Sequence, residues 1–209
     1  MLVWINGPFG GGKTQTAHEI ARRLPGSVIC DPEYVGFGLS RMAPRGTVDD
    51  FQHWVSWRLG VVEVLERVLA RHDGDVIVPM TVVEPDYFAE TVGALRSRGH
   101  DVAHFALLAE RATVVRRLRG RGVGHLTQFA LARGSLRRET FAMSRLDRCL
   151  DRLAGPEFAE HIRTDDVTVA QVADRIAAAT GLTLAPDTDG PMRGRLRRGW
   201  IGVRHIRFG

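Results

Sequence analysis

The sequence predicts an α/β fold in which a five-stranded parallel sheet is flanked by helices on both faces. Short apolar segments alternate along the chain with segments of helical periodicity, the pattern typical of a parallel sheet. Between the first strand and the first helix lies the octet Gly7–Thr14, which fits the phosphate-binding pattern G-x-x-x-x-G-K-[ST] in full. Lys13 in this octet is the only lysine among 29 cationic residues. The predicted fold class therefore depends on the alternation of strand and helix patterns and on the phosphate-binding octet.

The first half of the chain supplies three strands. Residues 2–5 form a continuous apolar run, as expected for a strand buried on both faces. The helix after the octet covers residues 14–24 and ends at Pro25-Gly26. Residues 27–31 and 75–80 are predicted as the second and third strands, with a helix over 51–71 before the third. The glycine-rich stretch around Gly36 and Gly38 carries no predicted element.

The second half continues the alternation. We predict helices over 87–98, 112–119 and 139–153, and strands over 102–109 and 161–164. Thr168 and Gln171 resemble a capping box that opens a last helix, which Gly181 closes. Residues 120–134 are glycine-rich and cationic, so we expect a lid of helix and loop over about 117–138. One domain over 1–185 is then followed by a basic linker and tail over 186–209.

The octet predicts the geometry of a triphosphate site. Backbone N–H groups of the Gly10–Lys13 turn would point at phosphate oxygens, with the positive end of the helix dipole behind them. Lys13 suits the β- and γ-phosphates, because a compact ammonium reaches between them, and Thr14 can give its hydroxyl to Mg²⁺. The alternative is a glycine-rich hairpin beside an unrelated helix. We expect nucleotide contacts from Gly7, Pro8, Phe9, Gly10, Gly11, Gly12, Lys13, Thr14 and Gln15.

Composition gives a broad frame for the function. Cys30 and Cys149 are the only cysteines, so a disulfide framework is not expected and a reducing compartment is. No segment approaches the roughly 20 apolar residues of a membrane span, and no signal peptide precedes the first strand. These observations predict a cytoplasmic protein. The net charge of +5 is compatible with nucleic acid, but phosphate ligands and a basic tail explain it equally well.

On these motifs the chain resembles the nucleoside and nucleotide kinase-like branch of the P-loop NTPases, over roughly residues 1–182. That branch includes adenylate kinase, shikimate kinase and chloramphenicol phosphotransferase. Residues 4–14, Asp31-Pro32-Glu33, Pro79-Met80-Thr81 and 161–165 are most similar to the tunicamycin-resistance ATP-binding proteins. The resemblance implies ATP as the bound nucleotide, with Mg²⁺, and protection against an antibiotic.

The second strand ends at Asp31, where open α/β sheets present groups to ligands. In the chloramphenicol phosphotransferases an Asp at the matching position accepts the proton of the substrate hydroxyl, so the resemblance implies this role for Asp31. Glu33 is a candidate to help hold the hydroxyl or a metal-bound water. The alternative is that Asp31 caps the turn before Pro32 and that Glu33 is solvated.

Metal binding departs from the usual pattern. The third strand has no acidic residue at its carboxyl end, where many P-loop NTPases keep an Asp for Mg²⁺. Asp31 is therefore also a candidate for the magnesium water shell, together with Thr14. Thr81 and Glu84 are further candidates from the following loop, although Glu84-Pro85 also fits a structural turn.

Arginines gather after the fourth strand. The pattern Arg117-x-x-Gly120-Arg121 is similar to the start of the adenylate kinase lid, where the first arginine lies against adenine and the second contacts phosphate. The resemblance thus implies base stacking for Arg117 and a phosphate clamp for Arg121. Arg137 and Arg138 are weaker candidates for a second clamp. A solvated basic helix end is the alternative for any one of them, and we expect His125 to face solvent.

The residues that bind the acceptor substrate are the hardest to predict from the sequence. The aromatic cluster after the second strand could form an apolar wall for an antibiotic or a nucleoside; it comprises Phe37, Phe51, His53, Trp54 and Trp57. His53 and Trp57 lie off the apolar stripe of the helix, so we predict that these two face the ligand. The alternative is that the aromatic residues belong to the core.

The predicted function is an ATP-dependent small-molecule kinase that gives resistance to a tunicamycin-like antibiotic. The alternative is an ATP-binding, membrane-associated protein that sequesters the drug without modifying it. The tail from Arg193 to Phe208 mixes six arginines with apolar residues. It could contact the inner face of an anionic membrane or fold back on the domain, and a nucleic-acid partner is not expected.

Overall fold

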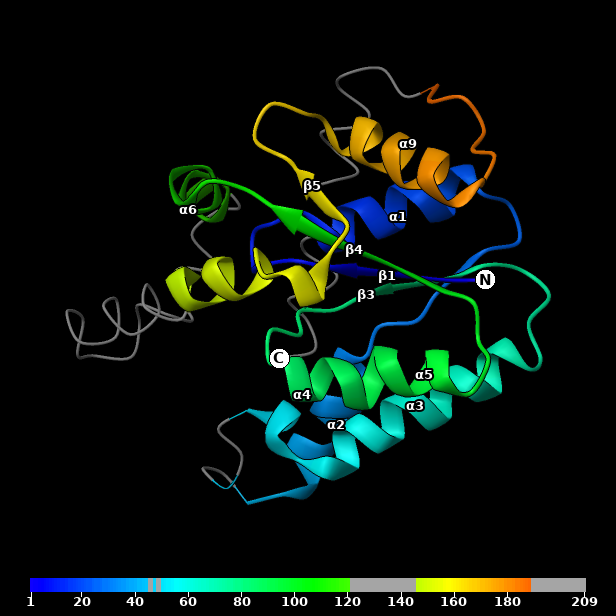
Figure 1. Cartoon of the computed structure of the whole chain (residues 1–209), viewed down its shortest axis with the longest axis vertical. Coiled ribbons are helices and arrows are strands. Elements are labelled where there is room, and N and C mark those ends of the chain that lie inside the picture. The colour runs from blue at the N-terminus through cyan, green and yellow to red at the C-terminus, as the bar shows by residue number, and fades with distance from the viewer. Residues whose placement is uncertain (45–46, 48–49, 121–145, 189–209) are drawn as a thin grey trace.

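The computed structural model describes residues 1–44, 47, 50–120 and 146–188. Its centre is a sheet of five parallel strands in the order β2-β3-β1-β4-β5. The strands are β1 (Leu2–Asn6), β2 (Val28–Ile29), β3 (Val76–Pro79), β4 (Val102–Leu108) and β5 (His161–Arg163). Helices cover both faces (Figure 1). The predicted fold class is confirmed.

β1 lies at the centre of the sheet, as its largely apolar sequence predicts. All five are buried, and Leu2 lies opposite Val76 of β3 and Val102 of β4. Since all the strands are parallel, their carboxyl ends meet at one edge of the sheet. The phosphate-binding octet follows β1 at that edge, beside the segments that follow β2, β3, β4 and β5.

One face is covered by α1 (Lys13–Arg23) and α9 (Val169–Thr180). The apolar side chains of the two helices, such as Ile20 and Ile176, pack on Val3 and Ile5 of β1. The predicted capping box is confirmed, because the Thr168 hydroxyl accepts from the Gln171 N–H and the Gln171 side chain accepts from the Thr168 N–H. Gly181 ends α9 with φ 71°, a left-handed conformation that glycine adopts without strain.

The other face is covered by α3 (Val55–Leu69) and by a continuous helical segment of three parts. These parts are α4 (Pro85–Phe88), a π-helical turn over Ala89–Gly93 and α5 (Ala94–Ser97). The core on this face contains Leu2 and Trp4 of β1 together with Trp57 of α3 and Leu95 of α5. The helix predicted over 51–71 is divided, since Phe51–His53 form a 3₁₀ turn before α3 begins.

A helix over residues 33–42, α2 (Glu33–Met42), occupies the stretch for which the sequence predicts no element. Gly36 is required in this helix by its neighbour, because a Cβ atom on Gly36 would lie 2.5 Å from the Phe51 ring. The glycine is thus explained by close packing rather than by a loop.

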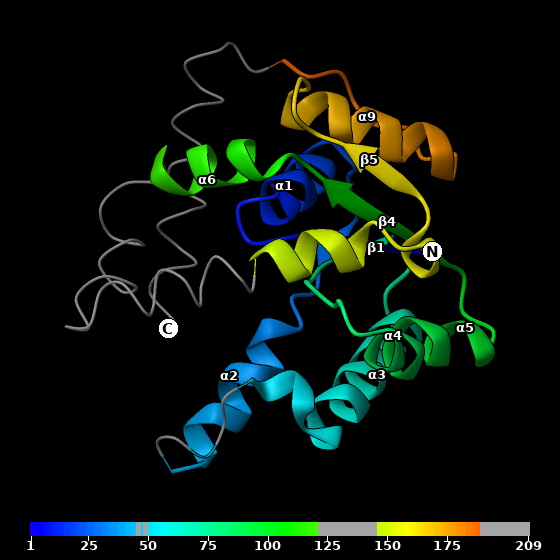
Figure 2. The ribbon, with the colours of Figure 1, turned by 60° about the vertical axis from the view of Figure 1, so that its left-hand side comes forward.

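Two further helices lie at the carboxyl edge of the sheet. α6 (Arg111–Gly120) follows β4, and a helix over 146–153 precedes a 3₁₀ turn (Pro156–Phe158) and β5. In Figures 1 and 2 both lie near the start of α1. The predicted helix over 139–153 is observed for its described part. The greater part of the predicted lid, with Arg121, His125, Arg137 and Arg138, lies outside the described residues, as does the tail from residue 189.

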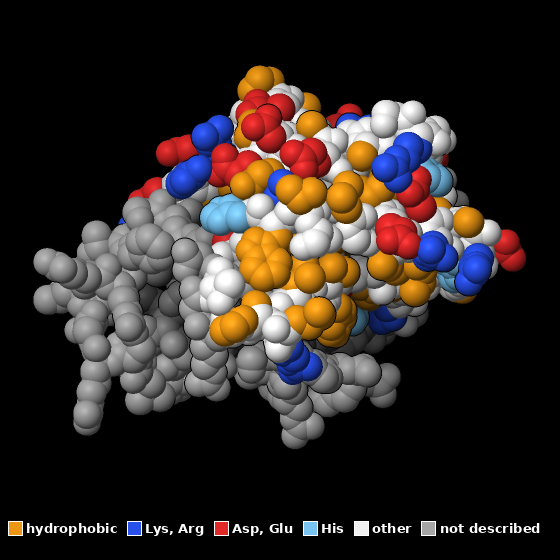
Figure 3. Space-filling model, turned by 90° about the horizontal axis from the view of Figure 1, so that it is seen from below, with side chains coloured by type: hydrophobic (Ala, Val, Ile, Leu, Met, Phe, Trp, Pro, Cys, Tyr) orange, Lys and Arg blue, Asp and Glu red, His pale blue; other side chains and the backbone are white. Residues whose placement is uncertain are grey.

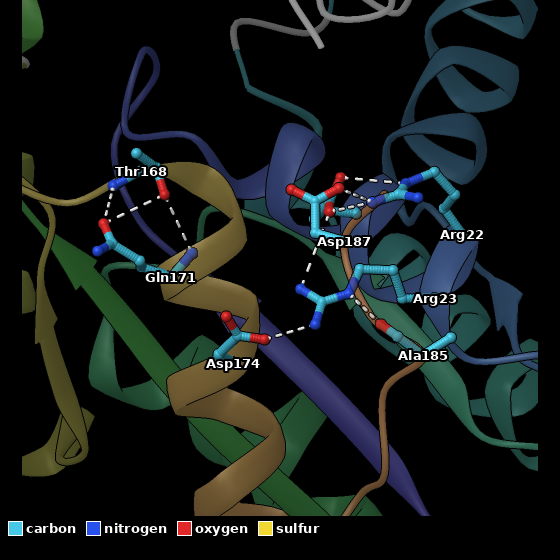
Figure 4. Close-up of polar contacts among 8 residues, drawn as sticks. Arg22, Arg23, Thr168, Gln171, Asp174, Ala185 and Asp187 are labelled. Atoms are coloured by element: carbon cyan, nitrogen blue, oxygen red, sulfur yellow. Dashed lines mark hydrogen bonds and ion pairs between the residues drawn. The ribbon is translucent and has the colours of Figure 1, made fainter. Parts of the chain in front are cut away.

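The chain after α9 is held against α1 (Figure 4). Ala185 and Arg23 exchange two hydrogen bonds of 2.7 Å, one from the Ala185 N–H and one from the Arg23 guanidinium. The same guanidinium pairs with Asp174 of α9 at 2.7 Å, and Arg22 pairs with Asp187 at 2.7 Å. Residues 185–187, which span the predicted boundary between domain and linker, therefore pack on the domain. No helix within the described ranges is long and apolar enough to cross a membrane.

Candidate functional site

The octet forms an open loop whose glycines are demanded by geometry. Gly10 and Gly12 have φ values of 81° and 100°, which side chains other than glycine rarely adopt. A Cβ atom on Gly11 would lie 2.9 Å from Pro8, whereas at Gly12 no atom lies within 4 Å of that position. The loop is therefore tight at Gly11 and open at Gly12, next to the N-terminus of α1. The open space at Gly12 leaves room for a phosphate group.

Lys13 is the first residue of α1 and is 7% exposed. Its ammonium donates to the Pro8 carbonyl oxygen at 3.3 Å and lies 5.3 Å from the centre of the Phe9 ring. The Phe9 ring itself is 67% exposed. Thr14 and Gln15 follow in the first turn of α1 and are half-buried. The structure thus brings together the residues of the predicted nucleotide loop, with the lysine folded back over it.

The base of the loop is fixed by Asn6, which the sequence analysis did not identify. Its fully buried amide oxygen accepts from the Gly7 N–H at 2.9 Å and from the Val82 N–H at 3.0 Å. Its amide nitrogen donates to the Val82 carbonyl oxygen at 2.7 Å, and the Thr81 hydroxyl donates to the Gly7 carbonyl oxygen at 2.7 Å. The start of the loop is therefore bound to the segment after β3.

Asp31 follows β2 at the same edge of the sheet, and its carboxylate interacts with the charge of Lys13. It also accepts a hydrogen bond from the Glu33 N–H at 2.9 Å, which is the capping contact weighed above as the alternative. Burial raises the pKa of the Asp31 carboxyl above its ordinary value, while the Glu33 N–H and Lys13 oppose this change. One carboxylate thus accepts from the first N–H of α2 and interacts electrostatically with Lys13.

Among the candidate metal ligands, Thr14 follows Lys13 in the first turn of α1, and the Asp31 carboxylate interacts with the charge of Lys13. The Thr81 hydroxyl donates to the Gly7 carbonyl, and Glu84 pairs with Arg148 at 2.5 Å and with Arg152 at 3.7 Å. Glu84 is therefore already engaged by two cations. A hydroxyl from the first turn of α1 and a nearby carboxylate are hard oxygen ligands that suit Mg²⁺.

Arg117 in α6 is held by the segment after β5. Its guanidinium donates to both the hydroxyl and the carbonyl oxygen of Thr164, the first at 2.9 Å. Burial lowers the pKa of Arg117, and the nearby Asp165 opposes that change. The next residue, Leu118, packs against the phosphate loop, since a Cβ atom on Gly10 would lie 2.9 Å from its Cγ. Arg117 thus lies in a helix that packs on the phosphate loop, and its contact with a nucleotide stays a prediction.

The helix over 146–153 brings Cys149 toward the same lysine. Burial raises the pKa of the Cys149 thiol to about 11, although the charge of Lys13 opposes the change. Asp147 of this helix pairs with Arg111 of α6 at 2.7 Å. α6 and the helix over 146–153 are therefore joined to each other by this ion pair.

Trp57 lies elsewhere than predicted. The side chain is fully buried, its indole N–H donates to the Pro32 carbonyl oxygen at 3.1 Å, and its ring packs 5.5 Å from that of Phe51. The indole presents no surface to a ligand, so we correct its role to that of a core residue that holds α3 against the turn after Asp31. His53 is exposed and lies 6.1 Å from the Tyr87 ring, and its contact with a substrate stays a prediction.

Apolar surface lies on α2 and α3, the two helices that follow β2. The large exposed apolar side chains of α2 and α3 are Tyr34, Met42, Val55, Leu59 and Val64. Figure 3 shows apolar side chains gathered at the centre of one face, with arginines and carboxylates around them. Tyr34 lies one helical turn after Asp31, and its N–H donates to the Asp31 carbonyl oxygen at 3.2 Å. Apolar groups therefore adjoin the candidate base.

Comparisons with known proteins agree with this geometry. A family model described as an AAA domain matches residues 2–146. The tunicamycin resistance protein of Deinococcus radiodurans is similar in structure, with a TM-score of 0.71 and 32% sequence identity over 88% of this chain and 98% of that chain. No match was found among curated proteins.

Kinases of small molecules share the fold at lower identity. Shikimate kinase from Bacteroides thetaiotaomicron has a TM-score of 0.59 and 16% identity, over 87% of this chain and 99% of its own. The APS kinase of Mycobacterium tuberculosis has a TM-score of 0.57 and 15% identity, over 86% of this chain and 96% of its own. These two likenesses concern the fold.

Proposed function

The chain belongs to the AAA domain family and has the fold of the P-loop kinases, and we propose that it transfers the γ-phosphoryl group of ATP to a hydroxyl of a small molecule. The observation that carries this proposal is that the loop with Lys13 follows β1 and Asp31 follows β2, at the same carboxyl edge of the parallel sheet. A phosphate-binding cation and a candidate proton acceptor lie together at the carboxyl edge of the sheet, where a hydroxyl could meet a triphosphate.

Each residue has a defined part in the proposed reaction. The loop amides and Lys13 neutralise phosphate charge, and Arg117 binds the nucleotide. Asp31 accepts the hydroxyl proton as the acceptor oxygen bonds to the γ-phosphorus and the bond to ADP breaks. Thr14 and Asp31 would hold Mg²⁺, which draws charge from the phosphates when bound. Arg121, the predicted phosphate clamp, lies outside the described residues and stays a prediction.

The acceptor we propose is a tunicamycin-like antibiotic. The support comes from the relative that is 32% identical over 88% of this chain and from the apolar surface near Asp31. Phosphorylation of the drug would give resistance. Sequestration of the drug without chemistry is the alternative, and peripheral contact of the tail with a membrane would suit it.

One experiment separates the two. Purified protein is incubated with Mg·ATP and tunicamycin, and the drug is analysed by mass spectrometry for one added phosphoryl group. The kinase proposal expects that product and an equal amount of ADP in the wild-type chain, and neither in Asp31→Asn. Protection in proportion to the protein with no change of drug mass would overturn the kinase and support sequestration.

A further inference from the structure

Thr164 is a buried residue to which the proposed reaction gives no part. It follows β5 at the carboxyl edge of the sheet and is 3% exposed. The Arg117 guanidinium donates to the Thr164 hydroxyl at 2.9 Å from one terminal nitrogen and to the Thr164 carbonyl oxygen from the other. Two bonds to a single residue fix both the position and the plane of the guanidinium.

Thr164 is itself fixed to the sheet. Its N–H donates at 2.8 Å to the carbonyl oxygen of Leu108, the last residue of β4, and its hydroxyl donates to the same oxygen at 3.2 Å. The next residue, Asp165, accepts from the Glu110 N–H at 2.9 Å, just before α6 begins. Two consecutive residues after β5 therefore hold α6 at its start and, through Arg117, near its end.

The helix held in this way packs on the phosphate loop. A Cβ atom on Gly10 would lie 2.9 Å from Leu118 and 3.2 Å from Val114, so both side chains lie against that glycine. Val114, Arg117 and Leu118 are three and four residues apart, which places them on one face of α6. Arg117 is half-buried. Its side chain therefore leaves α6 on the face that meets the loop and keeps part of its surface open to a ligand.

The partners of Arg117 suit a flat, uncharged ring better than a phosphate. The hydrogen bonds of a guanidinium lie in its plane, so the two bonds to Thr164 leave its faces available for stacking. Both terminal nitrogens already donate to Thr164, so fewer N–H groups are left for the bidentate contact that arginine makes with phosphate. The charge of Asp165 also acts on Arg117. The base is the flat, uncharged part of a nucleotide.

Resting on the nucleotide binding proposed above, we infer that Thr164 is a positioning residue, which holds the Arg117 guanidinium in the orientation that stacks on the nucleobase. The phosphates are left to the loop amides and Lys13. Without the hydroxyl, the bond to the backbone carbonyl holds the guanidinium alone, and the guanidinium can turn about it. Loss of the hydroxyl should therefore weaken the contact with the base and leave the contacts with the phosphates unchanged.

The test compares the binding of Mg·ATP with that of the magnesium complex of ribose 5-triphosphate, which lacks only the base, by calorimetry in the full-length chain. Thr164→Val removes the hydroxyl but keeps the shape of the side chain, and the Leu108 carbonyl stays paired with the N–H of residue 164. Thr164→Ser keeps the hydroxyl. The matched control is Thr180→Val, which removes a hydroxyl bond of 2.8 Å to the Ile176 carbonyl in α9.

We expect Thr164→Val to bind Mg·ATP about fivefold more weakly than the wild type does and to bind the ribose triphosphate equally well. Thr164→Ser and Thr180→Val should behave as the wild type toward both probes. Arg117→Lys keeps the charge but not the planar group, so it should also lose affinity for ATP alone, even if Thr164→Val does not fold. Adding Thr164→Val to Arg117→Lys should cause no further loss, because both act on one contact. Circular dichroism checks that each variant is folded.

Three results would overturn the inference. The first is a wild-type chain that binds both probes equally, and the second is unchanged Mg·ATP binding in folded Thr164→Val. The third is an equal loss for both probes, which would mean that Thr164 acts on the phosphate loop through the packing of α6. Release of ADP with candidate acceptors is followed in parallel. A loss for ATP alone in Thr164→Val, without ADP from any acceptor, would refute the kinase and leave the role of Thr164 standing.

Discussion

The side-chain amide of Asn6 hydrogen-bonds both the N–H and the carbonyl of Val82, which lies 76 positions further along the chain. The same amide oxygen accepts from the N–H of Gly7, the first residue of the phosphate loop. One side chain thus extends the pairing of β1 with β3 beyond the ends of the strands. The loop after β3 supports the phosphate loop through this contact, although β3 has no acidic residue at its carboxyl end.

Replacing Asn6 by Leu should therefore weaken both the fold and nucleotide binding. Three buried hydrogen bonds are lost and their backbone partners stay unpaired, so the free energy of unfolding should fall by about 2–4 kcal/mol. Urea unfolding measures this loss, and ATP titration measures the change in affinity. Thr81→Ser keeps the hydroxyl bond to Gly7 and serves as the control. Unchanged urea unfolding in Asn6→Leu would show that the contact is not important.

Asp31→Asn should abolish turnover yet stabilise the protein at neutral pH. The folded-state pKa of Asp31 is raised by burial, so its ionised form carries a cost that grows as pH rises through the ordinary value of 3.8 and beyond. Asn carries no such cost and can still accept from the Glu33 N–H. The melting temperature of the variant should exceed that of the wild type at pH 7, and the gain should disappear near pH 4. A variant less stable at pH 7 would contradict this reading.

The acid limb of the pH–rate profile depends on the raised pKa of Asp31. Because Asp31 must be ionised to accept a proton, activity should fall on acidification at a pH above the ordinary carboxyl value of 3.8. Measuring kcat/KM for the acceptor between pH 4 and 9 tests this. A profile that stays flat through the acid range would exclude Asp31 as the base.

His104 should make the protein sensitive to acid. Burial lowers the pKa of this histidine from 6.5 to about 4, so the stability it contributes is present above pH 6.5 and is lost as pH falls toward 4. At 1.36 kcal/mol per pKa unit the loss is about 3 kcal/mol. His104→Phe retains packing on Phe88, whose ring lies 4.6 Å away, and should flatten the curve of unfolding free energy against pH. An unfolding curve in His104→Phe that keeps the wild-type dependence on pH would contradict this account.

The segment after α9 should be needed for stability. A chain ending at residue 188 keeps the bonds between Arg23 and Ala185 and the ion pair of Arg22 with Asp187. A chain ending at residue 181 loses them, together with the packing of Leu182 and Leu184 on the core. We expect the shorter chain to lose about 2–4 kcal/mol of unfolding free energy in urea. Equal stability of the two would place the domain boundary before residue 182.

Elements set by local patterns were predictable from the sequence. The octet, the buried run of β1 and the capping box at Thr168 and Gln171 depend on neighbouring residues, and the structure has all three. α2 was missed because Gly36 signals a loop in isolation. Glycine is needed at position 36 because the backbone there packs against the ring of Phe51, and only the fold brings these two residues into contact.

The differences between the predicted and the observed site likewise arise from features that no local pattern of the sequence shows. A helix assumed to begin at Phe51 gave Trp57 the wrong face, because the 3₁₀ turn shifts the phase before α3 starts at Val55. The contacts of Asn6 with Val82 and of Arg117 with Thr164 join residues 76 and 47 positions apart. No periodicity in the sequence encodes such pairs, so their roles became visible only in three dimensions.

The central claim is that Lys13 and the loop around it bind the phosphates of a nucleotide. Calorimetric titration of the full-length chain with Mg·ATP tests it most directly, with Lys13→Ala as the comparison and Arg67→Ala, an exposed cation on α3, as the control. We predict binding by the wild type and by Arg67→Ala, and an affinity at least about a hundredfold weaker in Lys13→Ala. Equal affinity of Lys13→Ala and the wild type for Mg·ATP would contradict the claim.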